Sequence, residues 1–568
     1  MLTEVTLQPE GLDSQLKRIA GCEWDAVALS SHFTPSDLSS PEPGLYELSA
    51  DSRNLLRVCS ESLRMGGLLF VYGAPCRLPA YAEMLYRLGN GAWKLEFKYW
   101  IGIQLHACER RQTLDPSHVG ILLFHKVSRS RGTPFRLNTV RVPHRYCSAC
   151  GQNVRDWGGK KHLMSPNGSA LSDVWTDLPM RRLTDNRIPQ DVLDRITNLS
   201  SGHMLHIIED TQHDSLSCER ERVGVRVPND ASALVSNLNL DRVEVADCID
   251  FMGGLLPEHE HGAFDLIFAD PPYNLTKPYT NYTDAQAEEE YLAWCDRWLE
   301  SCARLLKPGG SMFVVNLPKW ALGHARTLDR LLDFRHWIVW HAPAEPRGKL
   351  LPAHYALLYY TKPGAPPVFN YDDSAREGFV GPPDSPEYCL RIPCVRKRRA
   401  AGDDRKVALT DVWFDVHRIR HKRDRDYHPC QLPEKLLERV VLLTSNPGQV
   451  VFDPFCGVGT TAVVAKRLDR RFLTTDTDPE YARITEAKLE QMGLDPARAM
   501  PRASVPRQPR AMTKRRIESV VQEIARELGR MPEMADIQRA NPQVHEAIHE
   551  MYPNPRKALG AARVVLNP

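Results

Sequence analysis

The stretch from Val450 to Asp478 constrains the fold of this chain more than any other. An apolar run, Val450–Phe452, ends in Asp453 and a glycine-rich turn, Cys456–Gly459; a helix-like segment and a second apolar run then close on Asp476. This order of strand, glycine turn, helix, strand and acid predicts one unit of a parallel α/β sheet. Glycines let the backbone approach a ligand closely, and an acid at the next strand end can bind ribose hydroxyls. A tight turn with a purely structural role is the alternative interpretation.

The length and composition set only broad limits. A chain of 568 residues has room for two to four domains, at about 150 residues each. Its net charge of +2 says little about partners, so local charge matters more. We see no signal-like start and no apolar run near the ~20 residues of a membrane span. We expect a cytoplasmic protein with reduced thiols, in which close pairs of its 14 cysteines are more suited to metal than to disulfides.

The sequence contains an internal repeat with a period of about 240 residues. Four segments recur in the same order in both halves of the chain. The matched pairs are 23–33 with 263–273, 65–71 with 308–314, 118–126 with 354–362, and 171–175 with 409–413. Four collinear matches indicate a duplication.

The two copies differ in their polar motifs. The second copy has Asp270-Pro271-Pro272-Tyr273 after its first matched strand, whereas the first copy has Ser30-Ser31-His32-Phe33. The first copy also lacks the glycine turn, with His206–Thr211 at the corresponding place. We therefore expect a degenerate domain at 1–225, an active domain at 226–498, a linker at 499–513 and a small helical domain at 514–568.

Strands alternate with helices through the second copy, which predicts an α/β fold with a doubly wound, mostly parallel sheet. A helix is expected at 291–306, ended by Lys307-Pro308-Gly309-Gly310. Segments 337–341 and 355–361 are expected to form an antiparallel pair at one edge. Tandem copies of this fold and a helical C-terminal domain complete the predicted architecture.

A strand that ends in Asp270-Pro271-Pro272-Tyr273 suits recognition of an aromatic amine. The Asp270 carboxylate and the Pro271 carbonyl can each accept a hydrogen bond from such an amine. Prolines have no N–H that competes and they stiffen the loop. Tyr273 offers a ring for a base to stack on, worth about 1–3 kcal/mol. Two acceptors aimed at the amine would favour its attack on a methyl sulfonium.

These two motifs together resemble the S-adenosylmethionine-dependent DNA amino-methyltransferases. The order, with the Asp-Pro-Pro-Tyr motif before the glycine turn, resembles their β group, a circular permutation of the doubly wound fold. The resemblance covers about 241–492 closely and 20–210 as a decayed copy. It implies that the amine belongs to a nucleobase flipped out of the duplex.

The resemblance also implies a set of cofactor-binding residues. Asp476 would bind the ribose, and Asp247 would lie near the adenine ring of the cofactor. Leu432 stands where the family usually has lysine, in a His-Pro segment that lines the methionine end. The residues expected to bind S-adenosylmethionine are Asp247, His428, Pro429, Asp453, Pro454, Phe455, Gly457, Gly459, Thr460, Thr461 and Asp476.

The segment 364–427 is expected to be a basic target-recognition insert, because this family reads its target sequence in that region. A solvated charged face is the alternative interpretation. The residues expected to contact DNA, through phosphates first, are Arg396, Lys397, Arg398, Arg399, Arg420, Lys422 and Arg423. Since members of the β group often pair as dimers, the first copy is expected to replace a second subunit within one chain.

Cys147 and Cys150 form a C-x-x-C pair, and Cys389 and Cys394 occupy the equivalent place in the second copy. A structural zinc ion bound by all four would join the two halves. Ordinary buried cysteines are the alternative.

The sequence therefore predicts a DNA-associated enzyme that methylates adenine N6 at specific sites. The alternatives are an N4-cytosine DNA methyltransferase and, from another class, a noncatalytic DNA-binding subunit. A restriction or defence partner is also compatible with the sequence.

Overall fold

The chain divides into two compact units, Met1–Glu490 and Gln491–Pro568. The structure is a computed structural model, and it describes residues 2–7, 12–39, 41, 46–107, 113–154, 164–209, 238–259, 262–276, 284–342, 349–370, 386–403, 407–419, 431–494, 514–551 and 559. The region expected as a domain at 1–225 and most of the one expected at 226–498 lie in the first unit, where buried side chains of both halves share one core cluster. Among the described helices, none has the length and apolarity needed to span a membrane.

The first sheet of unit 1 has seven strands in the order β1-β9-β2-β3-β5-β4-β8. The first four of these run parallel, β5 pairs antiparallel with both β3 and β4, and β8 is parallel to β4. Buried apolar runs form its centre, as expected for a sheet covered on both faces. The strands are β1 Leu2–Leu7, β2 Trp24–Ser30, β3 Leu63–Gly73, β4 Trp93–Gln104, β5 His118–Ser128, β8 Val174–Trp175 and β9 Met204–Glu209.

The second sheet has eight strands in the order β10-β17-β16-β11-β12-β14-β13-β15. The first five are parallel, β14 pairs antiparallel with β12 and β13, and β15 is parallel to β13. The predicted antiparallel pair is therefore found. The strands are β10 Arg242–Val245, β11 Phe264–Ala269, β12 Leu306–Asn316, β13 Asp333–His341, β14 His354–Thr361, β15 Val412–Trp413, β16 Val450–Asp453 and β17 Arg471–Asp476.

The two sheets follow the same strand order and the same directions. From β9 to β8 the first sheet matches β16 to β15 of the second, strand by strand. The difference lies at the other edge. In the second sheet, β17 follows the glycine turn and pairs with β16, whereas in the first sheet β1, from the start of the chain, pairs with β9. The matching topology agrees with the repeated sequence pattern.

Helices cover the sheets of unit 1. In α7, the buried residues Tyr291, Cys295, Trp298, Cys302 and Leu305 recur three or four positions apart, which gives the helix one apolar face. This helix ends at the predicted place, before Lys307. The helices are α1 Leu12–Ala20, α2 Pro35–Ser39, α3 Ala50–Ser62, α4 Leu78–Arg87, α5 Gln190–Leu199, α6 Cys248–Leu255, α7 Glu288–Leu305, α8 Pro318–Leu331, α9 Ile392–Ala400, α10 Glu434–Thr444, α11 Thr460–Arg467 and α12 Pro479–Leu494. A short pair of strands, β6 Arg141–Val142 and β7 Ser169–Ala170, lies outside the two sheets.

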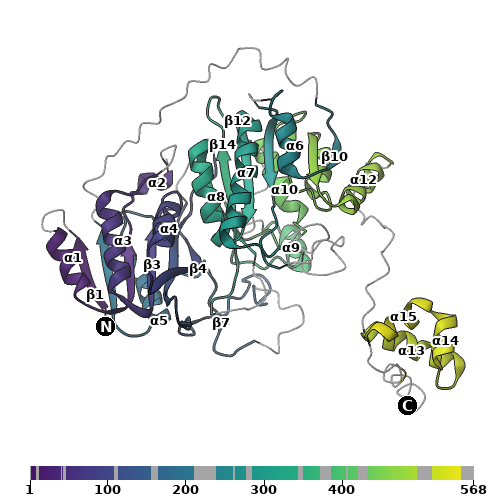
Figure 1. Ribbon diagram of the computed structural model, residues 1–568, viewed down its shortest axis with the longest axis horizontal. Coiled ribbons are helices and arrows are strands. Elements are labelled where there is room, and N and C mark those ends of the chain that lie inside the picture. Colours follow the sequence, from purple (N-terminus) through teal and green to yellow (C-terminus); the bar gives the residue numbers. More distant parts are fainter. Residues whose placement is uncertain are drawn as a thin grey trace. The chain divides into compact units, whose positions relative to one another are not determined.

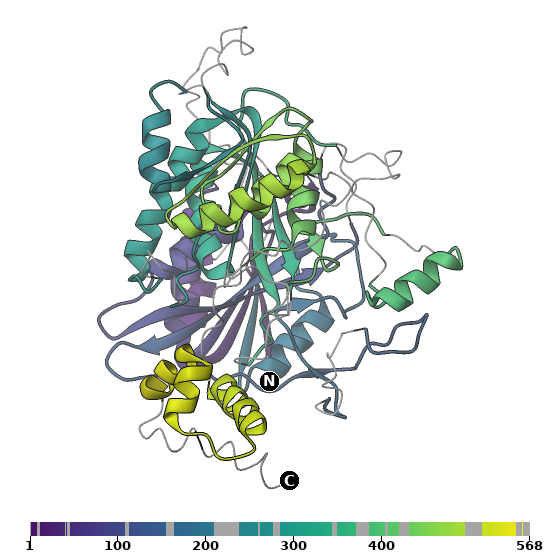
Figure 2. The same cartoon turned by 90° about the vertical axis from the view of Figure 1, so that its right-hand side faces the viewer.

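The two halves meet through corresponding elements. Helices α4 and α8 lie side by side (Figure 1). Trp100 of β4 and Trp337 of β13 stack with ring centroids 3.8 Å apart and planes 10° apart. Both tryptophans occupy the same register position, since they pair with Leu122 of β5 and Leu358 of β14. In Figure 1 the purple and blue elements of the first half lie beside the teal and green elements of the second, and Figure 2 shows the same arrangement turned by 90°.

The hydrogen bonds across this contact are reciprocal. Asp173, before β8, accepts from the backbone N–H of Ala353 at 2.8 Å. Asp411, before β15, accepts from the backbone N–H of Ser117 at 2.8 Å. Ala353 lies just before β14, and Ser117 lies just before β5, which is the matching strand of the first half. Because each aspartate bonds the equivalent residue of the other half, the contact has approximate two-fold symmetry. Isolated bridges Asp115–Thr410 and Ser172–Leu351 repeat the pattern.

Unit 2 contains three described helices, α13 Lys514–Leu528, α14 Met534–Ala540 and α15 Pro542–Met551. The bounds of α13 match the prediction, and Gly529 follows it with φ 62°, as a helix C-terminus favours. The second helix begins with Glu533 as N-cap, just after the proline expected to start it. Buried side chains from all three helices form one small core, which includes Ile517, Val521, Ile537, Val544 and Ile548.

Candidate functional site

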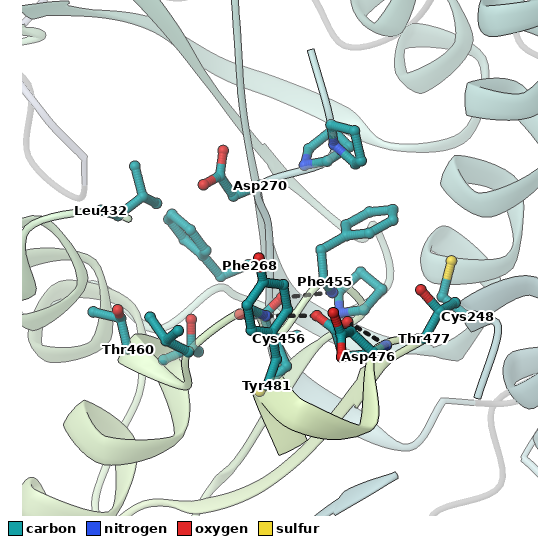
Figure 3. A pocket seen from close by; sticks show the side chains of 18 of the residues that line it. Cys248, Phe268, Asp270, Leu432, Phe455, Cys456, Thr460, Asp476, Thr477 and Tyr481 are labelled. Carbon is teal, nitrogen blue, oxygen red and sulfur yellow. Dashed lines mark hydrogen bonds between the residues drawn. The ribbon is translucent and has the colours of Figure 1, made fainter. Parts of the chain in front are cut away.

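A pocket lies at the carboxyl ends of the parallel strands of the second sheet, where α/β proteins bind ligands. The Asp270 loop follows β11, Asp453 ends β16 and Asp476 ends β17, and residues from all three line the pocket. The two sequence motifs therefore share one cavity (Figure 3). The residues that line it are Ala246, Asp247, Cys248, Phe268, Asp270, Pro271, Pro272, Trp294, Gln431, Leu432, Leu437, Asp453, Pro454, Phe455, Cys456, Gly457, Val458, Thr460, Thr461, Asp476, Thr477, Asp478 and Tyr481.

The loop after β11 is held in place by hydrogen bonds to its backbone. The Tyr291 hydroxyl donates to the Pro272 carbonyl at 2.6 Å, and the Trp320 indole N–H donates to the Tyr273 carbonyl at 2.8 Å. These donors come from α7 and α8, so the body of the domain fixes the loop. The position of Asp270 is therefore set before any ligand arrives.

Tyr273 does not lie where its predicted role requires. Its side chain is buried, and it is absent from the residues that line the pocket. Its hydroxyl donates to Asp270 Oδ1 at 2.6 Å, and its ring lies 6.1 Å from that of Tyr355. In this structure Tyr273 orients the Asp270 carboxyl group and does not offer a face for stacking.

The glycine turn after β16 is closed by hydrogen bonds to two acids. Asp453 Oδ1 accepts from the Phe455 N–H at 2.8 Å, and Asp476 Oδ2 accepts from the Gly457 N–H at 2.8 Å. Gly457 has φ 51°, in the left-handed region that favours glycine. The turn therefore needs the acid of the next strand as well as its own glycines.

Gly459 contributes to packing and not to the pocket lining. It precedes α11 with φ 78°, and a Cβ atom there would lie 2.3 Å from the Thr485 side chain of α12. A larger residue would push α12 away from the turn. Its neighbours Val458 and Thr460 line the pocket, and the role of Gly459 in cofactor binding stays a prediction.

Three carboxyl groups of the pocket have raised pKa values. Burial raises the pKa of Asp270 to about 8, with a smaller contribution from the charge of Asp453. Burial likewise raises the pKa of Asp453 to about 7 and that of Asp476 to about 6. The charge of Asp476 also raises the pKa of Asp453. Because these acids are buried and negative charges lie near them, a cationic ligand would stabilise their ionised forms.

Asp247 lies at the edge of the pocket with its side chain exposed. It is the N-cap of α6, and its Oδ1 accepts from the N–H groups of Ile249 at 2.8 Å and Asp250 at 3.2 Å. Eight of the predicted cofactor-binding residues line the pocket: Asp247, Asp453, Pro454, Phe455, Gly457, Thr460, Thr461 and Asp476. His428 and Pro429 lie outside the described residues, although the next described residues, Gln431 and Leu432, line the pocket.

Sequence reasoning missed several pocket residues. Phe268 comes from inside β11, Trp294 from α7, Leu437 from α10 and Tyr481 from α12. All four are apolar or aromatic residues within regular elements, where they look like core residues. Trp294 packs against Phe455 of the glycine turn, with ring centroids 5.8 Å apart. Only the meeting of distant elements distinguishes such a residue from an ordinary core position.

The basic segment expected to contact DNA is partly described. Arg396, Lys397 and Arg399 are exposed on α9, a helix that the sequence did not predict. Arg398 is buried, with its guanidinium 4.3 Å from the centre of the Tyr388 ring. The prediction that Arg398 contacts DNA is wrong. With about 3.6 residues in each turn of the helix, this side chain faces the packed side of α9 while its neighbours face away. Arg420, Lys422 and Arg423 lie outside the described residues.

The four predicted metal-ligand cysteines come together, and none lines the pocket. Cys147, Cys150, Cys389 and Cys394 have their sulfur atoms within 4.8 Å of one another. They join a loop of the first half to the segment around α9.

The matching strand ends of the first half are filled by protein. Ser30 and Ser31, at the end of β2, and the following Phe33 are all buried. Asn186 donates to the Ser31 carbonyl at 3.0 Å, and the Ile188 N–H donates to Ser30 Oγ at 3.3 Å. The segment before α5 therefore covers the edge where the second half has its pocket.

Comparisons with known proteins match the second half of the chain. The family model described as DNA methylase matches residues 264–487. The type II methyltransferase M.BamHI of Bacillus amyloliquefaciens is 36% identical over 252 residues, which are 41% of this chain and 54% of that protein. M.HpaI of Haemophilus parainfluenzae is 32% identical over 236 residues, 41% of this chain and 69% of that protein. The DNA adenine methyltransferase YhdJ of Escherichia coli (strain K12) is 31% identical over 232 residues, 40% of this chain and 76% of that protein. The chain thus spans about half the length of the first of these relatives and more of the others.

Proposed function

The chain belongs to the DNA methylase family, and from that premise we propose that it transfers a methyl group from S-adenosylmethionine to adenine N6 at specific sites in DNA. The observation that carries this proposal is that Asp270 and the acid-closed glycine turn line the same pocket. A donor bound at the turn and an amine bound at Asp270 would face each other there. The similarity to YhdJ, a DNA adenine methyltransferase, supports adenine as the target base.

The chain's own residues suit the binding of a cationic cofactor. The Asp476 oxygens accept from the Gly457 N–H at 2.8 Å and the Asp478 N–H at 2.9 Å, and each oxygen keeps a lone pair for a ribose hydroxyl. Asp453 and Asp270 add two further carboxyl groups. S-adenosylmethionine would supply a methyl group on a positively charged sulfur. Trp294, Phe455 and Tyr481 give the same pocket aromatic walls.

Asp270 positions the nucleophile and does not form a covalent bond. Its carboxylate and the Pro271 carbonyl accept hydrogen bonds from the two N–H groups of the target amine, as the attacking nitrogen becomes tetrahedral. The methylated nitrogen is then positively charged, and one of its protons leaves to solvent. Tyr273, which donates to Asp270 Oδ1, fixes the carboxyl plane. Cys456 is the turn's only thiol, and burial raises its pKa to about 12, so it carries no thiolate for covalent catalysis.

The exposed basic face of α9 is proposed to contact DNA phosphates. Arg396, Lys397 and Arg399 carry that face, and it belongs to the segment between β14 and α10 where this family reads its target. The first half, with the same strand order but a covered strand edge, is proposed to be a degenerate copy that takes the place of a second subunit. The reciprocal bonds of Asp173 and Asp411 support a one-chain pseudo-dimer. Sedimentation is expected to give a monomer, and an obligate homodimer through the first half would contradict this.

Incubation of the protein with labelled S-adenosylmethionine and DNA tests the activity. Digestion of the DNA to nucleosides should then yield N6-methyladenine. Label in N4-methylcytosine would keep the fold and the pocket but change the base. Cofactor binding without any transfer to DNA of varied sequence would favour the noncatalytic alternative.

A further inference from the structure

Four cysteines from distant parts of the chain meet at one point between the two halves. The sulfur atoms of Cys147 and Cys394 are 3.8 Å apart, those of Cys150 and Cys389 are 3.6 Å apart, and all four lie within 4.8 Å of one another. Cys147 and Cys150 belong to the first half, and Cys389 and Cys394 belong to the segment around the start of α9. This group lies outside the pocket and plays no part in the proposed methyl transfer.

The spacing of the sulfur atoms fits a tetrahedral metal site. Four sulfurs at about 2.3 Å from a central Zn²⁺ lie about 3.8 Å from one another. Bonded disulfides would need sulfur atoms about 2.0 Å apart, much closer than those in either pair. The four sulfurs also converge on one point, whereas two disulfides need only two separate pairs.

The backbone around Cys147 forms a tight knuckle. The Cys147 N–H donates to the Gln152 carbonyl at 2.7 Å, and the Gly151 N–H donates back to the Cys147 carbonyl at 2.8 Å. Gly151 closes the turn with φ 64°. The second pair is held differently, with Cys394 in the first turn of α9 and Cys389 in the chain just before it. Two pre-formed backbone segments thus present two sulfurs each.

Arg398 explains how the charge of such a site is balanced. One Zn²⁺ with four thiolates carries two net negative charges. The buried Arg398 guanidinium, one turn of α9 after Cys394, lies 4.3 Å from the centre of the Tyr388 ring, which packs in the same cluster as the cysteines. A positive charge buried next to this cluster offsets part of that negative charge, and groups around the ligands tune metal sites.

Apolar packing alone gives this contact little support. The cluster consists of Cys147, Tyr388, Cys389 and Cys394, with Cys150 and Val154 packed against it. Most of its members are the cysteines themselves, so little apolar area is buried apart from them. A structural metal ion commonly replaces a missing core in a small region.

We infer that Cys147, Cys150, Cys389 and Cys394 bind one Zn²⁺ as four thiolates. Four S–H groups lose their protons, which pass to solvent, and four Zn–S bonds form; no oxidant or reductant is needed. All four positions are filled by protein, so the site is structural and not catalytic. It ties α9, with its exposed basic face, to the first half of the chain.

Metal analysis of the full chain, purified without a histidine tag under reducing conditions, tests this inference. One zinc per chain is expected, together with four thiols that become reactive only after a mercurial reagent or a strong chelator releases the metal. Replacement by Co²⁺ should give the visible absorption of tetrahedral thiolate-bound cobalt. A chain with no zinc and four freely titrating thiols would overturn the inference, as would two disulfides found by mass spectrometry.

Variants separate metal binding from general stability. Cys150→Ser should reduce zinc from one per chain to near zero, while Cys22→Ser, an exposed cysteine outside the group, should keep it. Arg398→Met should weaken zinc retention against a competing chelator by about 10–100-fold, with Arg396→Met unchanged. Equal retention in the two arginine variants would remove Arg398 from the site. Should Cys150→Ser fail to fold, the cobalt spectrum and zinc content of the unaltered protein decide the matter.

Discussion

The ends of β2 and β11 occupy the same place in two sheets of the same order, but they serve different purposes. Ser30 and Asp270 are equivalent by register, because Leu29 pairs with Val71 and Ala269 pairs with Val314. Ser30 is fully buried and bonded to its own half, whereas Asp270 opens on a pocket. The same sheet therefore supports a site only where its strand edge is left uncovered and carries acids.

The largest expected effect comes from substituting Asp270, the acidic member of this pair. Asp270→Asn removes a charged acceptor from the amine, so methyl transfer should fall by about 10²–10³-fold. The matched change, Ser30→Ala, removes the bonds of Ser30 and should cost about 1–3 kcal/mol of unfolding free energy with little change in kcat. Single-turnover transfer of label to DNA and denaturant unfolding measure both. A similar loss of methyl transfer in both variants would contradict the proposal that only the second half carries the active site.

Substitution of the two reciprocal aspartates, Asp411 and Asp173, should lower the free energy of unfolding by different amounts. Asp411 lies 3.0 Å from His118 and 3.6 Å from His336, so Asp411→Asn should cost about 3 kcal/mol. Asp173 bonds backbone N–H groups, and Asp173→Asn should cost about 1 kcal/mol. Denaturant titration at pH 7 compares them, and equal losses would show that the contact is energetically symmetric.

The same pair should respond to pH in opposite directions. Burial alone would raise the pKa of Asp411, but His118 and His336 hold it well below its usual value of 3.8. Its stabilising contribution is therefore complete above that value and is lost as the pH falls below it. Burial raises the pKa of Asp173 to about 7, so its contribution is lost as the pH rises from about 4 toward 7. Asp411→Asn should reduce the dependence of the unfolding free energy on pH below about 3.8, and Asp173→Asn should reduce it between about 4 and 7.

Phosphate contacts should show a moderate difference between the halves. The double variant Lys397→Gln with Arg399→Gln, on α9, should make the plot of log binding constant against log salt concentration less steep, by an amount that corresponds to about two phosphate contacts. Arg131→Gln with Arg136→Gln, two exposed arginines of the first half, is the matched control and should leave it unchanged. Fluorescence anisotropy over a range of salt concentrations measures both slopes. Equal slopes in the two double variants would exclude α9 as the main phosphate contact.

The smallest expected effect is a release of less than about one proton on cofactor binding. Asp270 and Asp453, with pKa values of about 8 and 7, are partly protonated at pH 7. S-adenosylmethionine, whose sulfur is positively charged, should drive them toward the ionised form more than the uncharged S-adenosylhomocysteine does. Calorimetry in buffers of different ionisation enthalpy counts the protons. Ser30→Ala should leave the count unchanged, and an identical count for the two ligands would contradict the proposed role of the acids.

The sequence by itself determined the local elements and the motif ends. The glycine turn, the strand ending at Asp270, the end of α7 and the bounds of α13 follow from turn chemistry and apolar periodicity, which act between near neighbours. The repeat also predicted which half would carry the acids. These features need no knowledge of how distant segments meet.

Only the tertiary structure decided which distant residues share a site. In the folded chain Trp294 and Tyr481 line the pocket, and the Tyr273 hydroxyl donates a hydrogen bond to Asp270. Arg398, predicted to contact DNA, is packed against Tyr388 near the cysteine group. The stack of Trp100 on Trp337 joined two expected domains into one unit. Such contacts depend on the packing of whole sheets and helices, which residue patterns along the chain do not encode locally.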